Sequence, residues 1–118
     1  MPEHIEHYDK TVEERQNSVQ SMINAYPGRC CLYIERMPTC KTVDDITKKK
    51  YLVPNTLETD QLIYLIRGRL KLKKEDALFL YINKRMLSGQ RPIGDLYKKY
   101  KSEDDFLYIK YASENCFG

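Results

Sequence analysis

The stretch that decides the fold is KKKYLVPNTLETDQLIYLIRGRL, residues 48–70. Residues 48–54 alternate between two faces and end at a proline, which is typical of a strand. The part that follows places apolar side chains three and four residues apart, as an amphipathic helix does. One helical stripe comprises Ile63, Ile66 and Leu70, and a second comprises Leu62 and Leu65. With Thr56 or Thr59 as its cap, this is the clearest helix in the chain.

Three further strands and three further helices are predicted around this stretch. The strands cover residues 29–37, 77–83 and 106–112. The helices cover residues 3–9, the segment 11–26 and part of 88–100. Thr11 and Glu14 have the spacing of a capping box at the start of the second helix. After residue 28 the order is strand, strand, helix, strand, short helix, strand, which predicts an α+β roll.

Length and composition indicate one globular domain. The chain has 118 residues, of which 42% are hydrophobic and 31% are charged. Its longest apolar runs, such as ALFLYI, are far shorter than the roughly 20 residues that a membrane-spanning helix needs. The polar N-terminus lacks the pattern of a secretory signal, so a cytoplasmic protein is expected. Lysine and arginine are in excess over residues 41–75, which suggests acidic peptides, anionic lipid or nucleic acid as partners.

The cysteine spacing does not indicate a metal site or a catalytic thiol. No two of the four cysteines have the two-residue spacing of a zinc knuckle or a redox motif. A catalytic thiol needs a base, and both histidines lie near the N-terminus. The prediction is therefore reduced, packed cysteines, with no metal and no cofactor. They are Cys30, Cys31, Cys40 and Cys116.

Three blocks of the sequence resemble the autophagy ubiquitin-like modifiers of the GABARAP and light-chain-three type. The first block carries Lys50, Tyr51, Leu52, Val53, Pro54, Leu57, Gln61, Leu62, Ile66, Arg67 and Arg69. The others are EDALFLYIN and the final DDFLYIKYASENCFG. The resemblance implies a ubiquitin-like β-grasp roll, with a four-stranded mixed sheet, a crossing helix and two N-terminal helices. The expected divisions are a helical extension over 1–27 packed on the sheet, the β-grasp domain over 28–111 and a flexible conjugation tail over 112–118.

The resemblance also implies a use for the C-terminal glycine. In this family a cysteine protease exposes the glycine, and an activating and a conjugating enzyme carry its carboxyl to phosphatidylethanolamine. Gly118 would be the conjugation point, with Phe117 and Arg69 contacting the processing enzymes. Glycine suits this role because it has no Cβ to obstruct attack at its carbonyl. Gly118 is either encoded last or exposed by trimming.

A docking face for short peptides is expected beside the second strand. An edge strand can accept an added peptide strand, with pockets that select alternate side chains. The family's ligand has an aromatic residue, two spacers and an aliphatic residue, preceded by acids, which the lysines at 48–50 favour. The aromatic pocket would use Met22, Cys31, Tyr33, Lys50, Leu52 and Phe106. The aliphatic pocket would use Tyr51, Val53, Pro54, Leu57, Leu62 and Leu65.

Five positions depart from the family pattern and leave the peptide preference open. The family often has proline at Cys31, an acid at Ser18, phenylalanine at Leu62, a basic residue at Gly68 and glycine at Asp105. The predicted protein is a monomeric, non-enzymatic modifier of the cytoplasm and autophagosome membrane that recruits cargo receptors. One alternative is a non-conjugated peptide-binding adaptor in vesicle trafficking. A third hypothesis is a nucleic-acid binder that uses residues 48–50 and 67–74. The modifier hypothesis, in contrast, predicts no nucleic-acid partner.

Overall fold

The computed structural model describes residues 3–117. Its helices are α1 (Glu3–Asp9), α2 (Val12–Ala25), α3 (Thr59–Leu70) and α4 (Ile93–Tyr100). Its strands are β1 (Arg29–Arg36), β2 (Lys50–Pro54), β3 (Leu78–Ile82), β4 (Arg85–Met86) and β5 (Leu107–Ser113). A short 3-10 helix, η1 (Glu114–Phe117), follows β5. Within these residues, no helix has both the length and the apolar character needed to cross a bilayer.

The strands form one mixed sheet in the order β2-β1-β5-β3-β4. The inner strand β1 runs antiparallel to β2 and parallel to β5, as the predicted roll requires. The two-residue strand β4 was not predicted, and it makes the sheet five-stranded. It folds back on β3 through Asn83 and Lys84, which both have positive φ angles of 50° and 68°. That backbone suits a tight hairpin, but a turn without glycine is a weak signal in a sequence.

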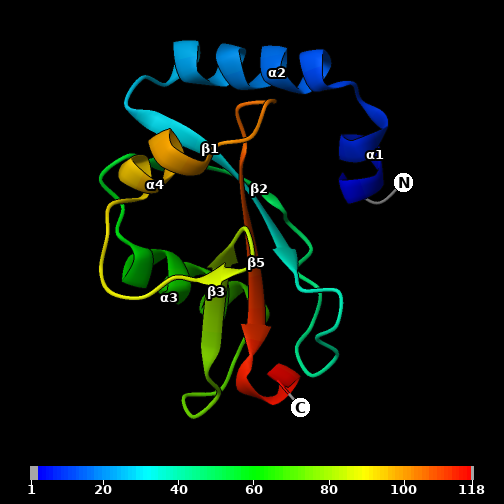
Figure 1. The fold of residues 1–118 in the computed structure, drawn as a ribbon, viewed down its shortest axis with the longest axis vertical. Coiled ribbons are helices and arrows are strands. Elements are labelled where there is room, and N and C mark those ends of the chain that lie inside the picture. Colours follow the sequence, from blue (N-terminus) through cyan, green and yellow to red (C-terminus); the bar gives the residue numbers. More distant parts are fainter. Residues whose placement is uncertain (1–2, 118) are drawn as a thin grey trace.

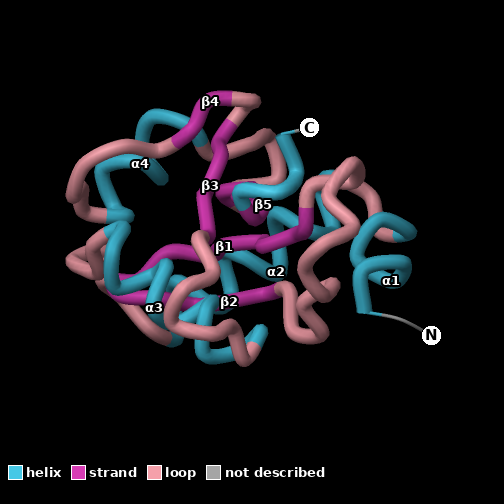
Figure 2. Tube along the Cα trace, turned by 90° about the horizontal axis from the view of Figure 1, so that it is seen from below, coloured by secondary structure: helices cyan, strands magenta, loops and turns pink. Residues whose placement is uncertain are grey.

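The two faces of the sheet carry separate apolar clusters. Helices α3 and α4 cover one face, and α1 lies on the other side, as seen along the molecule in Figure 2. Alternate residues of β1 divide between the faces: Leu32 and Ile34 join the main core, whereas Cys31 and Tyr33 join the smaller cluster. The last strand divides in the same way, because Leu107 and Ile109 point to the main core and Phe106 to the other face.

Helix α2 and the C-terminal end of the chain lie at opposite ends of the longest axis (Figure 1). Helix α2 begins with the predicted capping box, in which the amide of Glu14 donates to Thr11 Oγ1 and the amide of Thr11 donates to Glu14 Oε1. The helix stops at Ala25, just before Pro27 and Gly28, and Gly28 takes a φ of 83°. The turn into β1 needs that left-handed conformation, which glycine adopts at little cost.

Two details of the prediction are wrong. Helix α3 is capped at Glu58, not at Thr56 or Thr59, because Thr59 Oγ1 donates instead to the carbonyl of Gly89 at 2.9 Å. Strand β5 continues to Ser113, so Ala112 and Ser113 belong to the sheet and not to a tail. They pair with Phe79 and Leu78 of β3, which lies between β5 and the edge strand β4.

Candidate functional site

A cavity of about 440 Å³ opens between α2 and β2. Helix α2 supplies one wall and β2 the other, while Cys31 and Phe106 reach it from the sheet face that α2 covers. Most of the lining is apolar, and lysines lie at one side. The residues are Ser18, Val19, Met22, Cys31, Lys48, Lys50, Tyr51, Leu52 and Phe106. The cavity therefore suits a bulky apolar group that has negative charge nearby.

The cavity wall at Cys31 is neutral as well as apolar. Burial raises the pKa of the Cys31 thiol to about 11, so the group stays protonated at physiological pH. The Cys31 thiol packs in this wall as a small hydrophobic group. Met22 on α2 is 43% exposed, so this flexible side chain forms an adaptable rim.

Positive charge gathers on the β2 side of the cavity. Lys48 is exposed, and its Nζ lies 5.0 Å from the ring centroid of Tyr51. The guanidinium of Arg69 lies 6.0 Å from the same ring. Lys49 instead turns inward, where its Nζ bonds Asp45 Oδ1 at 2.9 Å and the carbonyl of Ile46 at 2.7 Å. Of the predicted lysine run, Lys48 and Lys50 are therefore the members that face a ligand.

Strand β2 is the outer strand at its edge of the described sheet. The amide of Ile34 donates to the carbonyl of Lys49, and the amide of Asn55 donates to that of Gly28. Because hydrogen-bonded pairs alternate along an antiparallel ladder, Tyr51 and Val53 also direct their backbone groups toward β1. The backbone groups of Lys50 and Leu52 consequently point to the open edge, where a peptide strand can pair with them.

Five of the six residues predicted for the aromatic pocket line this cavity. They are Met22, Cys31, Lys50, Leu52 and Phe106. The sixth, Tyr33, is fully buried and was wrongly placed. The imidazole of His7 stacks on its ring with centroids 3.9 Å apart, so α1 covers it. Val19 was missed, although its position on the inner face of α2 was visible in the helical spacing.

The predicted aliphatic pocket is largely closed. Tyr51, Val53 and Leu62 are buried in the main core, with Leu62 fully inaccessible. The reason is that Leu62, Ile66 and Leu70 form the buried stripe of α3 at four-residue spacing, instead of Ile63, Ile66 and Leu70. Pro54 is exposed, and Leu57 and Leu65 are half-buried against the core. Of the six residues predicted for the aliphatic pocket, these last three are the ones that leave apolar surface accessible.

A buried polar cluster behind the cavity was not predicted. Asp104, which is 2% exposed, accepts hydrogen bonds from Arg15 Nε at 2.8 Å, from the hydroxyl of Tyr108 and from the amide of Phe106 at 3.0 Å. Because the Tyr108 hydroxyl donates its proton to Asp104, the 2.8 Å contact with His7 must use the Nε2 proton of His7. The cluster thereby joins α1, α2 and β5.

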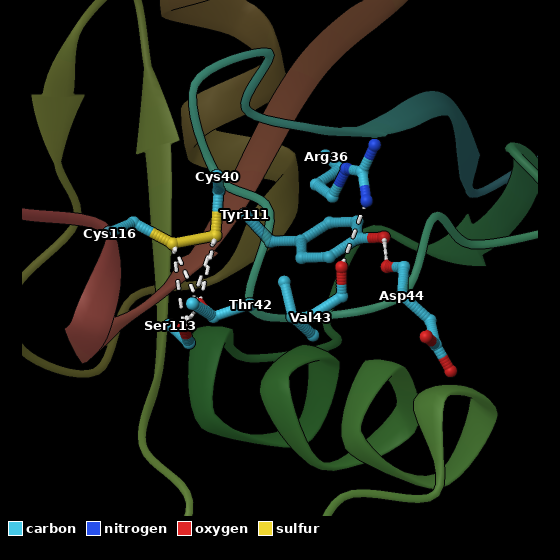
Figure 3. The surroundings of a disulfide bond; sticks show 8 residues. All are labelled: Arg36, Cys40, Thr42, Val43, Asp44, Tyr111, Ser113 and Cys116. Atoms are coloured by element: carbon cyan, nitrogen blue, oxygen red, sulfur yellow. Dashed lines mark hydrogen bonds between the residues drawn. A yellow bond between two sulfur atoms is a disulfide. The ribbon is translucent and has the colours of Figure 1, made fainter.

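The C-terminal end differs most from expectation. Cys40 and Cys116 form a disulfide with a Cα–Cα distance of 4.9 Å, so these two cysteines are not reduced as predicted, while Cys30 and Cys31 are free (Figure 3). The pairing joins residues 76 positions apart, which spacing rules cannot reveal. Phe117 ends η1 and Gly118 lies outside the described residues.

Comparison with known proteins identifies the family. A family model described as autophagy protein Atg8, ubiquitin-like, matches residues 14–118. The chain belongs to the Atg8 family. It is 38% identical over 110 residues to Autophagy-related protein 8 of Schizosaccharomyces pombe, covering 93% of this chain and 90% of that protein. The crystal structure of Trypanosoma brucei ATG8 superposes with a TM-score of 0.86 at 35% identity, covering 92% of this chain and 93% of that chain.

Membership of the Atg8 family confirms the resemblance seen in the sequence and the ubiquitin-like fold inferred from it. It also establishes the chain as a ubiquitin-like autophagy protein. The family match begins at residue 14, inside α2, so helix α1 lies before the matched residues. The family model therefore does not describe the contacts that α1 makes with the sheet.

Proposed function

We propose that this Atg8 protein is a non-enzymatic modifier that becomes joined through the Gly118 carboxyl to phosphatidylethanolamine. In that form it would move from the cytoplasm to the autophagosome membrane. The observation that carries the proposal is an open sheet edge beside an apolar cavity, on an Atg8 chain that contains Phe117 and Gly118. The partners would be the modifier-specific protease, an activating enzyme and a conjugating enzyme. Arg69 and Phe117 are the proposed contacts, and Arg69 is exposed at the end of α3.

The docking edge would recruit receptors through short acidic peptides. The peptide would add a strand beside β2 and bond the backbone groups of Lys50 and Leu52. Its aromatic residue would fill the cavity above Phe106, and its acids would meet Lys48 and Lys50. The aliphatic residue, four positions on, would lie on the half-buried Leu57 and Leu65. Such a ligand orders on binding, so a Kd of about 1 µM, or about −8 kcal/mol, is expected.

The conjugation step is tested by reconstitution. The purified chain is incubated with Atg8 activating and conjugating enzymes, ATP and liposomes that contain phosphatidylethanolamine. A faster-migrating, membrane-bound product is expected, and Gly118→Ala should prevent its formation. Omission of the activating enzyme is the second control. A chain that binds peptides but yields no such product would support the alternative, a non-conjugated peptide-binding adaptor.

Truncation of Leu52 should weaken peptide binding by roughly ten- to a hundredfold. Leu52 combines an apolar contact to the ligand with a backbone position at the open edge, and loss of a buried leucine contact is worth about 1.5–3 kcal/mol. Isothermal titration of an acidic aromatic-x-x-aliphatic peptide against Leu52→Ala measures the effect.

Met86→Ala is the matched control for that titration. Met86 is 53% exposed on β4, at the opposite edge of the sheet. Its truncation should leave the Kd unchanged. Equal affinity of the Leu52→Ala variant and the unaltered chain would show that the peptide does not dock along β2.

A further inference from the structure

The disulfide lies two residues before the proposed conjugation glycine, and it joins two segments of unequal rigidity. Cys40 is fully buried in the loop between β1 and β2. Tyr111 fixes that loop, because its hydroxyl donates to the carbonyl of Asp44 at 2.6 Å and accepts from the amide of Ile46 at 2.7 Å. Arg36 Nη1 also donates to the carbonyl of Val43 at 3.0 Å (Figure 3). Cys40 is therefore a fixed anchor.

Cys116 lies instead on η1, a single 3-10 turn of four residues. So short a helix is not stable alone. Besides the disulfide, the Cys116 sulfur contacts the hydroxyl oxygens of Thr42 and Ser113, each at 3.4 Å (Figure 3). Contacts of a thiol with hydroxyls are weak. Reduction of the bond therefore removes the main tie between η1 and the loop.

The tie limits how far the glycine carboxyl can reach. Two residues span at most about 7 Å, so while the disulfide holds Cys116 against the loop, only that length of chain can extend from the anchored position. With the bond reduced and η1 unfolded, the five residues after Ser113 can extend about 17 Å from the end of the sheet. An enzyme that accepts the carboxyl in a narrow channel needs the longer reach.

We infer that Cys40 and Cys116 form a reversible redox modification site that gates conjugation: the disulfide form withholds the C-terminal carboxyl, and the dithiol form presents it. The inference rests on the proposed function, whose reacting group it regulates. Disulfides in the cytoplasm are generally transient and serve catalysis or redox sensing, which agrees with a switch rather than a structural staple.

Glutathione disulfide is the oxidant class that we assign. The thiolate of the half-buried Cys116 attacks one glutathione sulfur, which forms a mixed disulfide and releases one glutathione thiolate. The thiolate of Cys40 then attacks the Cys116 sulfur and releases the second. The two protons from the protein thiols pass to the two glutathione thiolates. Overall, two protein thiols and one glutathione disulfide give one protein disulfide and two glutathione molecules.

The test compares both redox forms of the full chain in the liposome conjugation assay. One sample is treated with glutathione disulfide and another with dithiothreitol, and each is desalted before addition to reduced enzymes in a buffer without thiols. Intact mass should show the loss of two hydrogen atoms on oxidation. The oxidised chain should conjugate at a rate lower by roughly tenfold or more, because a misplaced reacting group loses at least that much.

Cys116→Ser is the matched control, since it removes both the disulfide and the accessible thiol that glutathione disulfide would otherwise cap, whereas the remaining Cys40 is fully buried. This variant, taken through both treatments, should conjugate at the rate of the reduced chain. Equal rates for the two forms of the unaltered chain, or no disulfide after oxidation, would overturn the gate. Failure of the reduced chain to conjugate would instead overturn the proposed function, and the gate with it.

Discussion

Replacing Asp104 with alanine is expected to lower the free energy of unfolding by about 3–5 kcal/mol, because it leaves a buried charge without its partner. The Arg15 guanidinium, whose side chain is 14% exposed, would lose the carboxylate at 2.8 Å. The amide of Phe106 and the hydroxyl of Tyr108 would lose their acceptor in the same step. Urea denaturation followed by circular dichroism measures the change.

Glu103→Ala is the matched control for Asp104. It removes an exposed carboxylate one residue earlier, so a change within about 0.5 kcal/mol is expected. Arg15 also donates to the carbonyls of His7 and Lys10, so loss of Asp104 should loosen α1 before the rest of the domain. Amide hydrogen exchange should then accelerate in residues 6–9 ahead of the sheet. A stability for Asp104→Ala within 1 kcal/mol of the unaltered chain would contradict this role for the cluster.

The same region shows how far sequence patterns reach. The alternation in 106–111 matches the observed division of its side chains between the two clusters, since period-two alternation depends only on local geometry. The neighbouring Asp105 was identified as a departure from the family glycine, but its consequence was not predictable. It keeps a φ of 67°, in the region that favours glycine. Its carboxylate bonds Gln20 Nε2 at 2.9 Å and lies 3.4 Å from Lys101 Nζ, which offsets the strained backbone.

The aromatic cavity was predictable because its residues lie on regular elements whose faces the sequence reveals. The closed aliphatic surface was not, since two overlapping stripes on α3 fit helical spacing, and only packing decides which one is buried. The Cys40–Cys116 pairing depends on how a loop folds against the end of β5, and neither segment has a periodic pattern. Polar helix α1 has no apolar stripe either, so nothing in its sequence indicated that it buries a histidine.

That histidine should make the docking of α1 sensitive to acid. Burial, the largest cause, lowers the pKa of His7 from 6.5 to about 4. The positive charges of Lys50, Arg15 and Lys10 lower it further, and Asp104 opposes them. The Nε2 proton already bonds Tyr108, and Nδ1 has no hydrogen-bond partner among the described residues. A second proton would therefore sit on a buried nitrogen without an acceptor, which costs free energy.

The sign of the effect follows from proton uptake. Between pH 6.5 and about 4, a released His7 binds a proton and the docked His7 does not, so acid favours release. The docked state should be stable above pH 6.5, lose stability progressively as the pH falls, and have lost about 3 kcal/mol near pH 4. Amide exchange of α1, measured at pH values from 7.5 to 4 and corrected for intrinsic rates, should show falling protection.

His7→Phe is the variant that isolates the titration. A phenyl ring preserves the stack on Tyr33 and the edge contact with Phe106, whose centroid lies 5.0 Å from that of His7, but it cannot take a proton. The variant loses the bond to Tyr108, so its α1 should be less protected at pH 7.5. Its protection should nevertheless change little with pH, because the proton-linked term is gone. A pH dependence as steep as that of the unaltered chain would assign the acid response to the carboxylates, not to His7.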